Sequence, residues 1–399
     1  MDQKRIEKAL KKVNKYIDDL TIKSKDNIPH NVVSDIKNFF TWDNEKRNPL
    51  EQPYLFDWSY YNGVVMEGLY YLYIKNPQEG MKYYSYIKEY LDSMIINEKG
   101  KNILNPNLAG YVDYHGGDCY KTASLLIKMS DGKDPYFEIA RDLYQDLTDS
   151  THSNIKGNVV SLKYTEKALG NNYWHGWGKS NPPKYKVWLD GIYMAQPFLA
   201  HFATLINDEK QLALINERLT WVSRNMLASN GLYYHAANSK EDVCPYHWLR
   251  AIGWYGMAMV DVMEVLPKKY LEERKMSLKL FVDGMLKYQH PSGLWANLVD
   301  RPVTNTNRLE TSGTAMLVYT ILKGVRNDWL SDNYLDPAIK AFLGLVDLKL
   351  TEEGLKDIYL KASANNLNNY ENLDYYLVNE GKGVGPFIMA YSEMLYLIK

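Results

Sequence analysis

The chain has 399 residues, a formal net charge of −1 and a hydrophobic content of 46%. This balance offers no basic field for nucleic acid, and no apolar run reaches the roughly 18 residues that a membrane span needs. Two cysteines, Cys119 and Cys244, exclude a disulfide framework and a cysteine-based metal site. The N-terminal segment is charged and amphipathic, unlike a signal peptide, so we expect a cytoplasmic protein with no membrane or nucleic-acid partner.

The aromatic content is high, with 34 Tyr, 10 Trp and 9 Phe. Tyrosine and tryptophan combine an apolar face with a polar edge, which suits a wet groove that binds sugar rings. An AT-rich genome would raise the tyrosine count by itself, but it would not explain the tryptophans. The composition therefore favours a carbohydrate-binding surface.

Amphipathic periodicity predicts helices along the first half of the chain. They comprise one or two helices within residues 1–40, broken near 25–29, followed by 57–73, 78–97, 118–129 and 136–147. Residues 150–187 are irregular and aromatic, with a pair of short strands expected near 155–162. A loop of this length is usually functional.

The second half of the chain repeats. Three Gly-Leu pairs, beginning at Gly231, Gly293 and Gly354, stand 62 and 61 residues apart, and each precedes a loop and a helix rich in small residues. These helices are expected at 250–265, 311–324 and 383–397. A unit of about 60 residues with this order is a helical hairpin, and six such units fill a chain of this length. We therefore predict an all-α (α/α)6 barrel, a six-hairpin toroid, as a single catalytic domain over residues 1–399 that includes the N-terminal helical segment 1–40.

One carboxylate, Asp190, lies in an otherwise apolar and aromatic run over residues 186–198. It falls at or just before the start of a predicted helix. An aspartate in that place often caps the helix by accepting a bond from a backbone N–H. In an apolar cleft the same carboxyl group would have a raised pKa and could transfer a proton. This segment alone leaves both interpretations open.

Four clusters of polar and aromatic residues lie where predicted loops meet predicted helices. They fall within residues 57–63, 111–118, 173–190 and 234–254. In a toroid, all four would face the same end of the barrel and line a cleft. Asp118 and Asp190 are the best acid/base candidates, because neighbouring carboxylates and an aromatic lining both raise a carboxyl pKa.

A metal site is the main competing interpretation, because His115, Asp118, His175 and His235 could gather around an ion. The sequence has no HExxH motif and no closely spaced histidine pair, so we expect no metal. It also lacks a nucleophile elbow, a phosphate-binding loop and a dinucleotide fingerprint.

Individual residues also have plainer interpretations. His235 could be a packed polar residue bonded to the backbone, Trp254 could belong to the core, and Asp113 could be a turn residue. Arg250 opens a predicted helix, where the helix dipole disfavours a cation. That position favours an anion-binding role for Arg250.

At these residues the sequence resembles glycoside hydrolase family 105, the unsaturated rhamnogalacturonyl hydrolases. The runs WLDGIYMA at 188–195 and WLRAIGWYGMA at 248–258 are similar to its catalytic and substrate-contacting segments. Further similar segments are 293–295 with 300–302, 309–316 and 383–387, and the resemblance extends from about residue 57 to the end. It implies an (α/α)6 barrel, in agreement with the repeat, and a glycosidase that needs no metal or organic cofactor.

The implied reaction removes a 4,5-unsaturated uronic acid that a polysaccharide lyase has left at the end of an oligosaccharide. A carboxylic acid protonates C4, water adds at C5, and the resulting hemiketal opens to release the remaining sugar. The resemblance assigns catalysis to Asp190 as general acid/base, Asp118 as second carboxylate and His235. Whether Asp118 or Asp113 is the second carboxylate stays open.

The expected substrate-binding residues are Trp188, Arg250, Trp254, His175, Asn62 and Tyr61. A guanidinium suits a uronate, which favours Arg250 for that role, and Trp188 resembles a ring-stacking residue. The segment between His235 and Arg250 is shorter than is usual in the family, which alters the rim of the cleft. The expected partner is a small oligosaccharide, first of all unsaturated rhamnogalacturonan disaccharide, and we expect a monomer or weak homodimer.

Three alternatives remain at this point. An unsaturated glucuronyl hydrolase acting on glycosaminoglycan or ulvan fragments would differ only in its substrate. A sugar epimerase on the same toroid would need a proton-shuttling histidine pair, which His175 and His235 could supply. A non-catalytic sugar-binding toroid would keep Trp188 and Trp254 but would not require Asp190.

Overall fold

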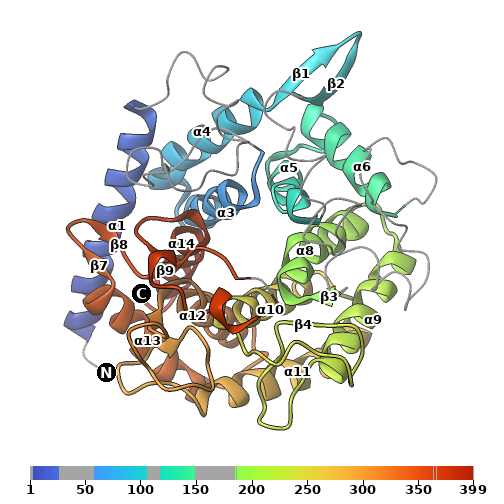
Figure 1. Ribbon diagram of the computed structural model, residues 1–399. Helices are drawn as coiled ribbons and strands as arrows, with labels where there is room; N and C mark the ends of the chain where they lie inside the picture. The colour runs from blue at the N-terminus through green and yellow to red at the C-terminus, as the bar shows by residue number, and fades with distance from the viewer. Residues whose placement is uncertain are drawn as a thin grey trace.

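Helices make up most of the described chain and form two concentric layers (Figure 1). The computed structural model describes residues 3–26, 58–105, 117–148, 185, 187–362, 364 and 366–398. The inner layer consists of α3 (Tyr60–Lys75), α5 (Ala123–Met129), α8 (Leu189–Leu205), α10 (Leu249–Met263), α12 (Thr311–Arg326) and α14 (Gly381–Met394). The outer layer consists of α1 (Gln3–Asp26), α4 (Pro77–Ser93), α6 (Pro135–Thr148), α9 (Glu209–Asn225), α11 (Lys268–Leu286) and α13 (Leu335–Leu348).

The inner helices close into a ring. Each packs against the next in chain order, from α3 through α5, α8, α10 and α12 to α14, and α14 packs back against α3. Five outer helices each pack on the inner helix before them, while α1 lies against α13 and α14. Within the described residues this gives six helices in each layer, which confirms the predicted (α/α)6 toroid.

Burial distinguishes the two layers as their sequences predict. Every residue of α10 and α14 is buried, whereas α11 buries one stripe that includes Leu278, Phe281 and Met285. A helix that is apolar on all sides belongs inside a protein, and an amphipathic helix belongs at its surface. None of the helices in the described part of the chain is long and apolar enough to cross a bilayer.

Small residues in the inner helices allow those helices to approach closely. A Cβ atom on Gly313 of α12 would lie 2.8 Å from the carbonyl carbon of Leu249 in α10. A Cβ atom on Gly385 of α14 would lie 2.7 Å from the carbonyl carbon of Val64 in α3. Such distances are sterically impossible without displacing backbone, so side chains at these two positions would push the ring apart.

Ten short strands form five antiparallel pairs in the described residues. They are β1 (Ile95–Glu98) with β2 (Lys101–Leu104), β3 (Val187–Trp188) with β4 (Ala236–Ala237), β5 (Trp295–Ala296) with β6 (Leu309–Glu310), β7 (Leu350–Thr351) with β8 (Gly354–Leu355), and β9 (Ile358–Tyr359) with β10 (Tyr376–Leu377). Short 3-10 helices are η2 (Gly117–Tyr120), η3 (Asp332–Tyr334), η4 (Leu367–Asn369) and η5 (Leu373–Tyr375). No larger sheet occurs in this part of the chain.

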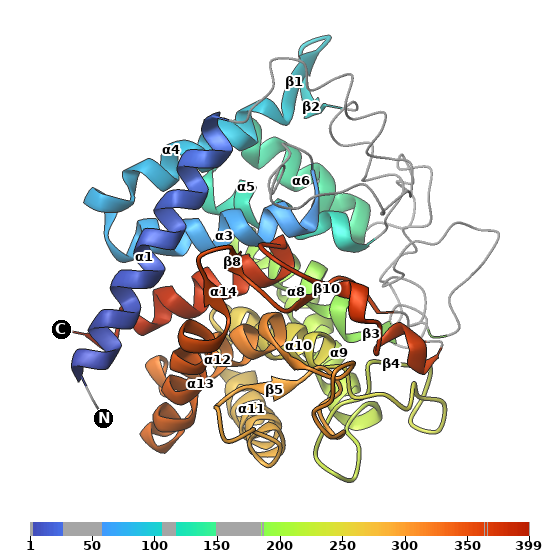
Figure 2. The same cartoon turned by 60° about the vertical axis from the view of Figure 1, so that its left-hand side comes forward.

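The β1–β2 hairpin corrects one sequence prediction. A helix was expected over residues 78–97, but α4 ends at Ser93 and the chain continues into a hairpin that projects from the ring (Figure 2). The turn residues Lys99 and Gly100 have φ of 53° and 84°, the left-handed pair that matches the twist of a two-residue hairpin turn. The strands predicted near 155–162 lie outside the described residues.

The repeat predicted from the Gly-Leu pairs is visible in the backbone. Gly231, Gly293 and Gly354 have φ of 89°, 94° and 128°, a region that favours glycine. Each glycine turns the chain from an outer helix into the loop that leads to the next inner helix.

Three equivalent backbone bonds join the inner helices to these loops. Leu189 N donates to His235 O at 3.1 Å, Leu249 N to Asn297 O at 2.8 Å, and Thr311 N to Asp357 O at 3.1 Å. Each bond uses the first residue of an inner helix and a loop residue that precedes the next inner helix. We call these three contacts the rim bonds, since they place the starts of α8, α10 and α12 at one end of the toroid beside the loops.

Candidate active site

The first rim bond and the β3–β4 pair bring two titratable side chains together. Trp188 pairs with Ala236, and Leu189 N donates to the carbonyl of His235. Asp190 directly follows Leu189, the donor of this bond, and His235 supplies its acceptor from the other segment. Their side chains meet with Asp190 Oδ2 3.2 Å from His235 Nε2.

Asp190 is not the N-cap of α8. The cap is Trp188, which makes no side-chain capping bond, and Asp190 is the second residue of the helix. The Asp190 carboxylate is 5% exposed and faces the His235 imidazole. The capping interpretation is therefore wrong, and Asp190 is a nearly buried carboxyl group at the helix start.

His235 lies in a box of aromatic rings. Its ring centroid is 4.8 Å from that of Trp188 and 4.9 Å from that of Trp248, and the residue is fully buried. Its Nδ1 atom is 2.7 Å from the hydroxyl of Tyr370, and that hydroxyl is 3.5 Å from the sulfur of Cys244. The buried imidazole thus lies between two polar groups, with the Tyr370 hydroxyl at hydrogen-bond distance from Nδ1 and the Asp190 carboxylate 3.2 Å from Nε2.

A second carboxylate, Asp118, belongs to the same region. Helix η2, which carries Asp118, packs against both α8 and α3, and Asp118 is 5% exposed. Burial raises the pKa of the Tyr60 hydroxyl, and the negative charges of Asp118, Glu380 and Asp190 raise it further against the opposing charge of Arg250. Tyr60 therefore keeps its proton and lies within electrostatic range of charged groups from four separate segments.

Arg250 occupies the first turn of α10 and is 1% exposed. Its guanidinium donates to the carbonyl of Tyr359 and, at 2.9 Å, to that of Leu360, and it lies 4.6 Å from the centroid of the Trp248 ring. The cation at this helix start is therefore compensated by backbone carbonyls. A guanidinium has five N–H donors, so two carbonyl bonds do not exhaust its capacity to bind a carboxylate.

The other predicted binding residues differ in how far they are exposed to solvent. Asn62 is 1% exposed in the first turn of α3, where its N–H donates to Ser59 Oγ at 3.4 Å. Tyr61 is partly exposed and meets Tyr60 edge-on at 5.4 Å. Trp254 is 1% exposed and stacks on Tyr193 at 4.9 Å with an interplanar angle of 15°. The surroundings of Trp254 are those of the core, one helical turn below Arg250.

The remaining predicted residues, His175, His115 and Asp113, lie outside the described residues. Among the residues that are described, no group of three or more His, Cys, Asp or Glu side chains could hold a metal ion. The structure thus brings together Trp188, Asp190, His235, Asp118 and Arg250, with Tyr61 and Asn62 on the adjoining helix α3.

The sequence did not single out Tyr60 or Tyr370. Tyr60 directly precedes the predicted Tyr61, and the register of α3 decides which ring lies among the charges. Tyr370 comes 135 residues after His235, and no local pattern indicates its contact with the imidazole. Only the arrangement of the toroid brings it there.

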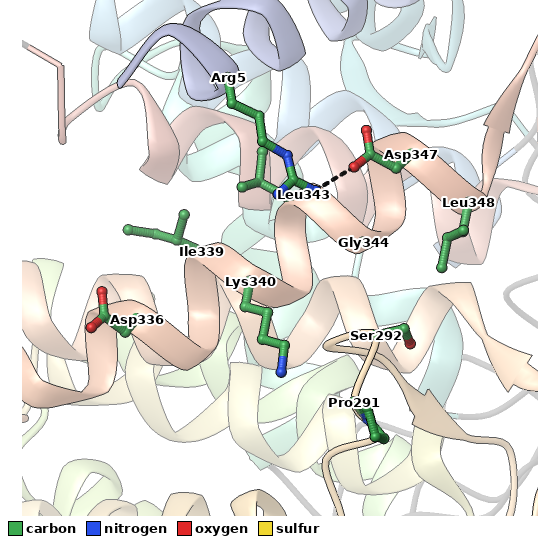
Figure 3. Close-up of a pocket in the computed structure, with 10 residues that line it drawn as sticks. All are labelled: Arg5, Pro291, Ser292, Asp336, Ile339, Lys340, Leu343, Gly344, Asp347 and Leu348. Atoms are coloured by element: carbon green, nitrogen blue, oxygen red, sulfur yellow. Dashed lines mark hydrogen bonds and ion pairs between the residues drawn. The ribbon is translucent and has the colours of Figure 1, made fainter. Parts of the chain in front are cut away.

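A surface hollow lies on another part of the molecule, between α1, α13 and the turn at Pro291 and Ser292 (Figure 3). Its charged groups include the exposed pair Arg5 and Asp347, whose nitrogen and oxygen atoms are 2.7 Å apart. Neither buried carboxyl groups nor aromatic rings line it, so it offers no acid/base chemistry.

The chain and its six-hairpin toroid have counterparts among known proteins. The sequence model of Glycosyl Hydrolase Family 88 matches residues 32–398. The chain belongs to this family. As a member of Glycosyl Hydrolase Family 88 the protein is a glycosidase.

The chain is also similar to a solved structure, that of a family 105 glycoside hydrolase from C. acetobutylicum ATCC 824. It is 26% identical, with a TM-score of 0.67, and the match covers 92% of this chain and 98% of that one. This agrees with the resemblance to family 105 seen in the sequence.

Two curated relatives match over shorter stretches. The 24.9 kDa protein in the picA locus of Rhizobium radiobacter is 30% identical over 199 residues, which cover 43% of this chain and 85% of that protein. The unsaturated 3S-rhamnoglycuronyl hydrolase of Formosa agariphila is 25% identical over 229 residues, 53% of this chain and 58% of that enzyme.

Proposed function

We propose that this family 88 glycosidase removes 4,5-unsaturated uronic acid residues, of the galacturonyl type, from oligosaccharides made by polysaccharide lyases. Its proposed substrate is unsaturated rhamnogalacturonan disaccharide, and its proposed reaction is hydration of the C4=C5 double bond. Asp190 acts as the general acid/base.

The observation that carries this proposal is the contact between Asp190 and His235 inside an aromatic box. A nearly buried carboxyl group beside apolar rings favours its protonated form, which the first step requires. The second carboxylate, Asp118, adds negative charge to the same region and favours that form further.

The reaction proceeds in three steps. The Asp190 carboxyl group gives its proton to C4, and the positive charge that develops at C5 is shared with the ring oxygen. Water adds at C5 and returns a proton to the Asp190 carboxylate, so that the acid is regenerated. The C5 hemiketal then opens to a ketone, and the hemiacetal left at C1 breaks down to release the remaining sugar as an alcohol.

The other residues bind and orient the substrate. Arg250 receives the uronate, Trp188 stacks on a sugar ring, and His235 holds the Asp190 carboxyl group. The proposed binding set is completed by Trp254, His175, Asn62 and Tyr61. Asp118 acts as the second carboxylate, and the chemistry uses no metal or organic cofactor.

The names of two relatives support an unsaturated uronyl substrate in general and leave the choice of sugar to the experiment below. The Formosa agariphila enzyme acts on unsaturated rhamnoglycuronyl groups by its name, and the C. acetobutylicum protein is a family 105 hydrolase. We further propose that the 399-residue chain forms one catalytic domain. The cytoplasmic location and the monomeric or weakly dimeric state stay predictions, which cell fractionation and sedimentation test.

The test is a time course of ultraviolet absorbance on lyase-generated unsaturated rhamnogalacturonan disaccharide, with an unsaturated glycosaminoglycan disaccharide in parallel. The conjugated double bond absorbs and its hydrated product does not. We expect the absorbance to fall on the first substrate. A fall only on the second would keep the mechanism and make the protein a glucuronyl hydrolase, and no fall on either would overturn the proposal.

A further inference from the structure

Tyr370 contacts His235 on the side opposite to Asp190. Its hydroxyl oxygen is 2.7 Å from Nδ1, while Asp190 Oδ2 is 3.2 Å from Nε2. Because an imidazole has one hydrogen-bonding atom at each of these positions, the state of one nitrogen determines the state of the other. A group that fixes Nδ1 therefore decides what Nε2 presents to the carboxyl group.

The position of Tyr370 is itself firmly held. The residue is fully buried, and its carbonyl accepts a bond from Asn297 Nδ2 at 2.7 Å. The same Asn297 accepts from Trp248 Nε1 at 2.9 Å, and the Tyr370 ring packs 4.8 Å from Tyr246. The loop therefore presents the hydroxyl in one orientation.

The direction of the hydrogen bonds follows from the chemistry of the partners. Among the described residues, the Tyr370 hydroxyl has two hydrogen-bonding neighbours, His235 Nδ1 at 2.7 Å and Cys244 Sγ at 3.5 Å. An imidazole nitrogen is a much better acceptor than a thiol sulfur, so the phenol donates to Nδ1 and the thiol donates to the phenol oxygen. With Nδ1 as acceptor, the ring carries its proton on Nε2, the nitrogen that lies 3.2 Å from Asp190 Oδ2.

We propose that Tyr370 is a positioning residue that keeps the reactive proton on Asp190 rather than on His235. This inference rests on the proposed function. One proton can reside in the pair in two ways, as a carboxylic acid beside a neutral imidazole or as a carboxylate beside an imidazolium. Donation from Tyr370 is compatible with the neutral imidazole only, because an imidazolium needs Nδ1 for its own proton. Only the first arrangement can protonate C4.

Other ionisable groups around the pair come from every neighbouring segment. Cys244 and Tyr246 lie on the loop before α10 beside Tyr370, and burial raises the pKa of the Tyr370 hydroxyl so that it keeps its proton. On the side of Asp190 the charged groups are Asp118 from η2, Arg250 from α10 and Glu380 before α14, with Tyr60 among them. Removing the Tyr370 hydroxyl alone takes a partner from Cys244 and leaves the residues on the side of Asp190 in place.

The test compares wild type with Tyr370→Phe in kcat/KM and kcat against pH on the unsaturated disaccharide. In the variant the imidazolium–carboxylate arrangement gains population, so the plateau falls by about ten- to a hundredfold. The alkaline limb is the fall in rate as the Asp190–His235 pair loses its proton. In the variant this limb moves upward by about one to two pH units, the logarithm of the same tenfold to hundredfold factor, because the pair binds its proton more tightly. At pH values above both limbs, the rates of wild type and variant converge.

Two control variants separate this effect from a structural one. The Tyr359 hydroxyl donates to Asn369 O at 3.0 Å and accepts from Asn372 N at 2.9 Å, so Tyr359→Phe disturbs the loop around Tyr370 while leaving the bond to His235. Any loss in that variant should be equal at every pH. Cys244→Ala should leave the alkaline limb of the pH profile in place, since the Tyr370 hydroxyl keeps its bond to His235 Nδ1 without the thiol. If Tyr370→Phe also loses activity equally at every pH, the proposal is overturned.

A measurement on the resting protein needs neither a variant nor turnover. Nitrogen-15 NMR of histidine-labelled wild type reports the tautomer of each of the eight histidines, and His235→Gln assigns the signal. We expect His235 to be neutral with its proton on Nε2, and a proton on Nδ1 would overturn the proposal. Because this result is independent of substrate, a protein that fails to hydrate the disaccharide would overturn the proposed function separately.

Discussion

The imidazole of His235 and the carboxyl group of Asp190 meet at 3.2 Å because the residue before Asp190 donates its backbone N–H to the carbonyl of His235. The side-chain contact and the backbone bond therefore share one pair of segments. A change that moves the start of α8 must move both members of the pair together. This coupling ties the position of both side chains to the backbone of the first rim bond.

Asp190→Asn removes the proton that hydration requires while keeping the size of the side chain. We expect kcat to fall by about 10²- to 10⁴-fold, the usual contribution of a general acid, while the disaccharide still binds. Absorbance kinetics and calorimetric titration measure the two effects.

The matched control for that variant is Asp208→Asn. Asp208 caps α9 by accepting from Gln211 N at 3.0 Å, and asparagine is an equally good cap. This variant should keep wild-type turnover. Unchanged turnover in Asp190→Asn would contradict the proposed mechanism.

Glu310 holds the start of α12. Its buried carboxylate accepts bonds from Ser312 N at 3.0 Å, Gly313 N at 2.8 Å and Tyr359 N at 3.1 Å. Glu310→Gln removes the charge that favours a helix N-terminus and leaves a single acceptor oxygen, so we expect a loss of about 2 to 3 kcal/mol in the free energy of unfolding. Urea unfolding measures it, and Glu353→Gln, at an exposed position, should change stability by less than about 0.5 kcal/mol.

His201 should make stability depend on pH. Burial lowers its pKa to about 4, with the charge of Lys128 adding to the effect. In the unfolded chain the pKa is about 6.5, so the unfolded state takes up the proton first as pH falls. Stability is then unaffected above about pH 6.5 and declines by up to about 3 kcal/mol toward pH 4.

Unfolding curves of wild type and His201→Gln at about pH 7.5 and pH 4.5 test this. The glutamine variant should lose less stability between the two pH values. Asp283 and Asp357 do not interfere, because their pKa values are lowered and they cost stability only at more acidic pH. Equal pH dependence in the two proteins would refute a role for His201.

Lys323 forms a buried ion pair near the end of α12. Its Nζ lies 2.7 Å from Asp261 Oδ1 and 2.8 Å from the Tyr319 hydroxyl, and both members of the ion pair are at most 2% exposed. Lys323→Met leaves the Asp261 carboxylate buried without its cation, so we expect a loss of about 3 to 5 kcal/mol in the free energy of unfolding.

Adding Asp261→Asn to that variant should restore part of the stability, because it removes the isolated charge. Lys279→Met is the exposed counterpart, with its lysine 61% exposed beside Asp283, and should cost about 1 kcal/mol at most. Chemical unfolding of all three proteins gives the comparison, and a similar cost for the buried and exposed lysines would contradict the prediction.

The sequence predicted the toroid because its signals are local and repeated. The Gly-Leu turns need only neighbouring residues to take a left-handed backbone, and the inner helices α10 and α14 are buried along their whole length. The same locality made Asp190 a candidate acid, and the apolar residues that flank it are buried with it in α8.

Other features depend on contacts that no local pattern encodes. Tyr370 reaches His235 across 135 residues, and Arg250 donates to carbonyls about 110 residues away. The helix expected to reach residue 97 ended early because two isoleucines and a left-handed turn favoured a hairpin over another helical turn. Which tyrosine of the 60–61 pair lies among the charges depends on the packing of α3 against its neighbours.

The three rim bonds also bear on how such an enzyme can diversify. Each bond fixes a loop at one residue, so the stretch beyond that residue can lengthen, shorten or change sequence while the anchored ends stay in place. The exposed residues 240–242, for example, can be rebuilt, because the backbone bonds of His235 to Tyr246 and of Cys244 to Ala236 hold the base of their loop. New sugar preferences can therefore arise by loop replacement, while the chemistry is inherited unchanged.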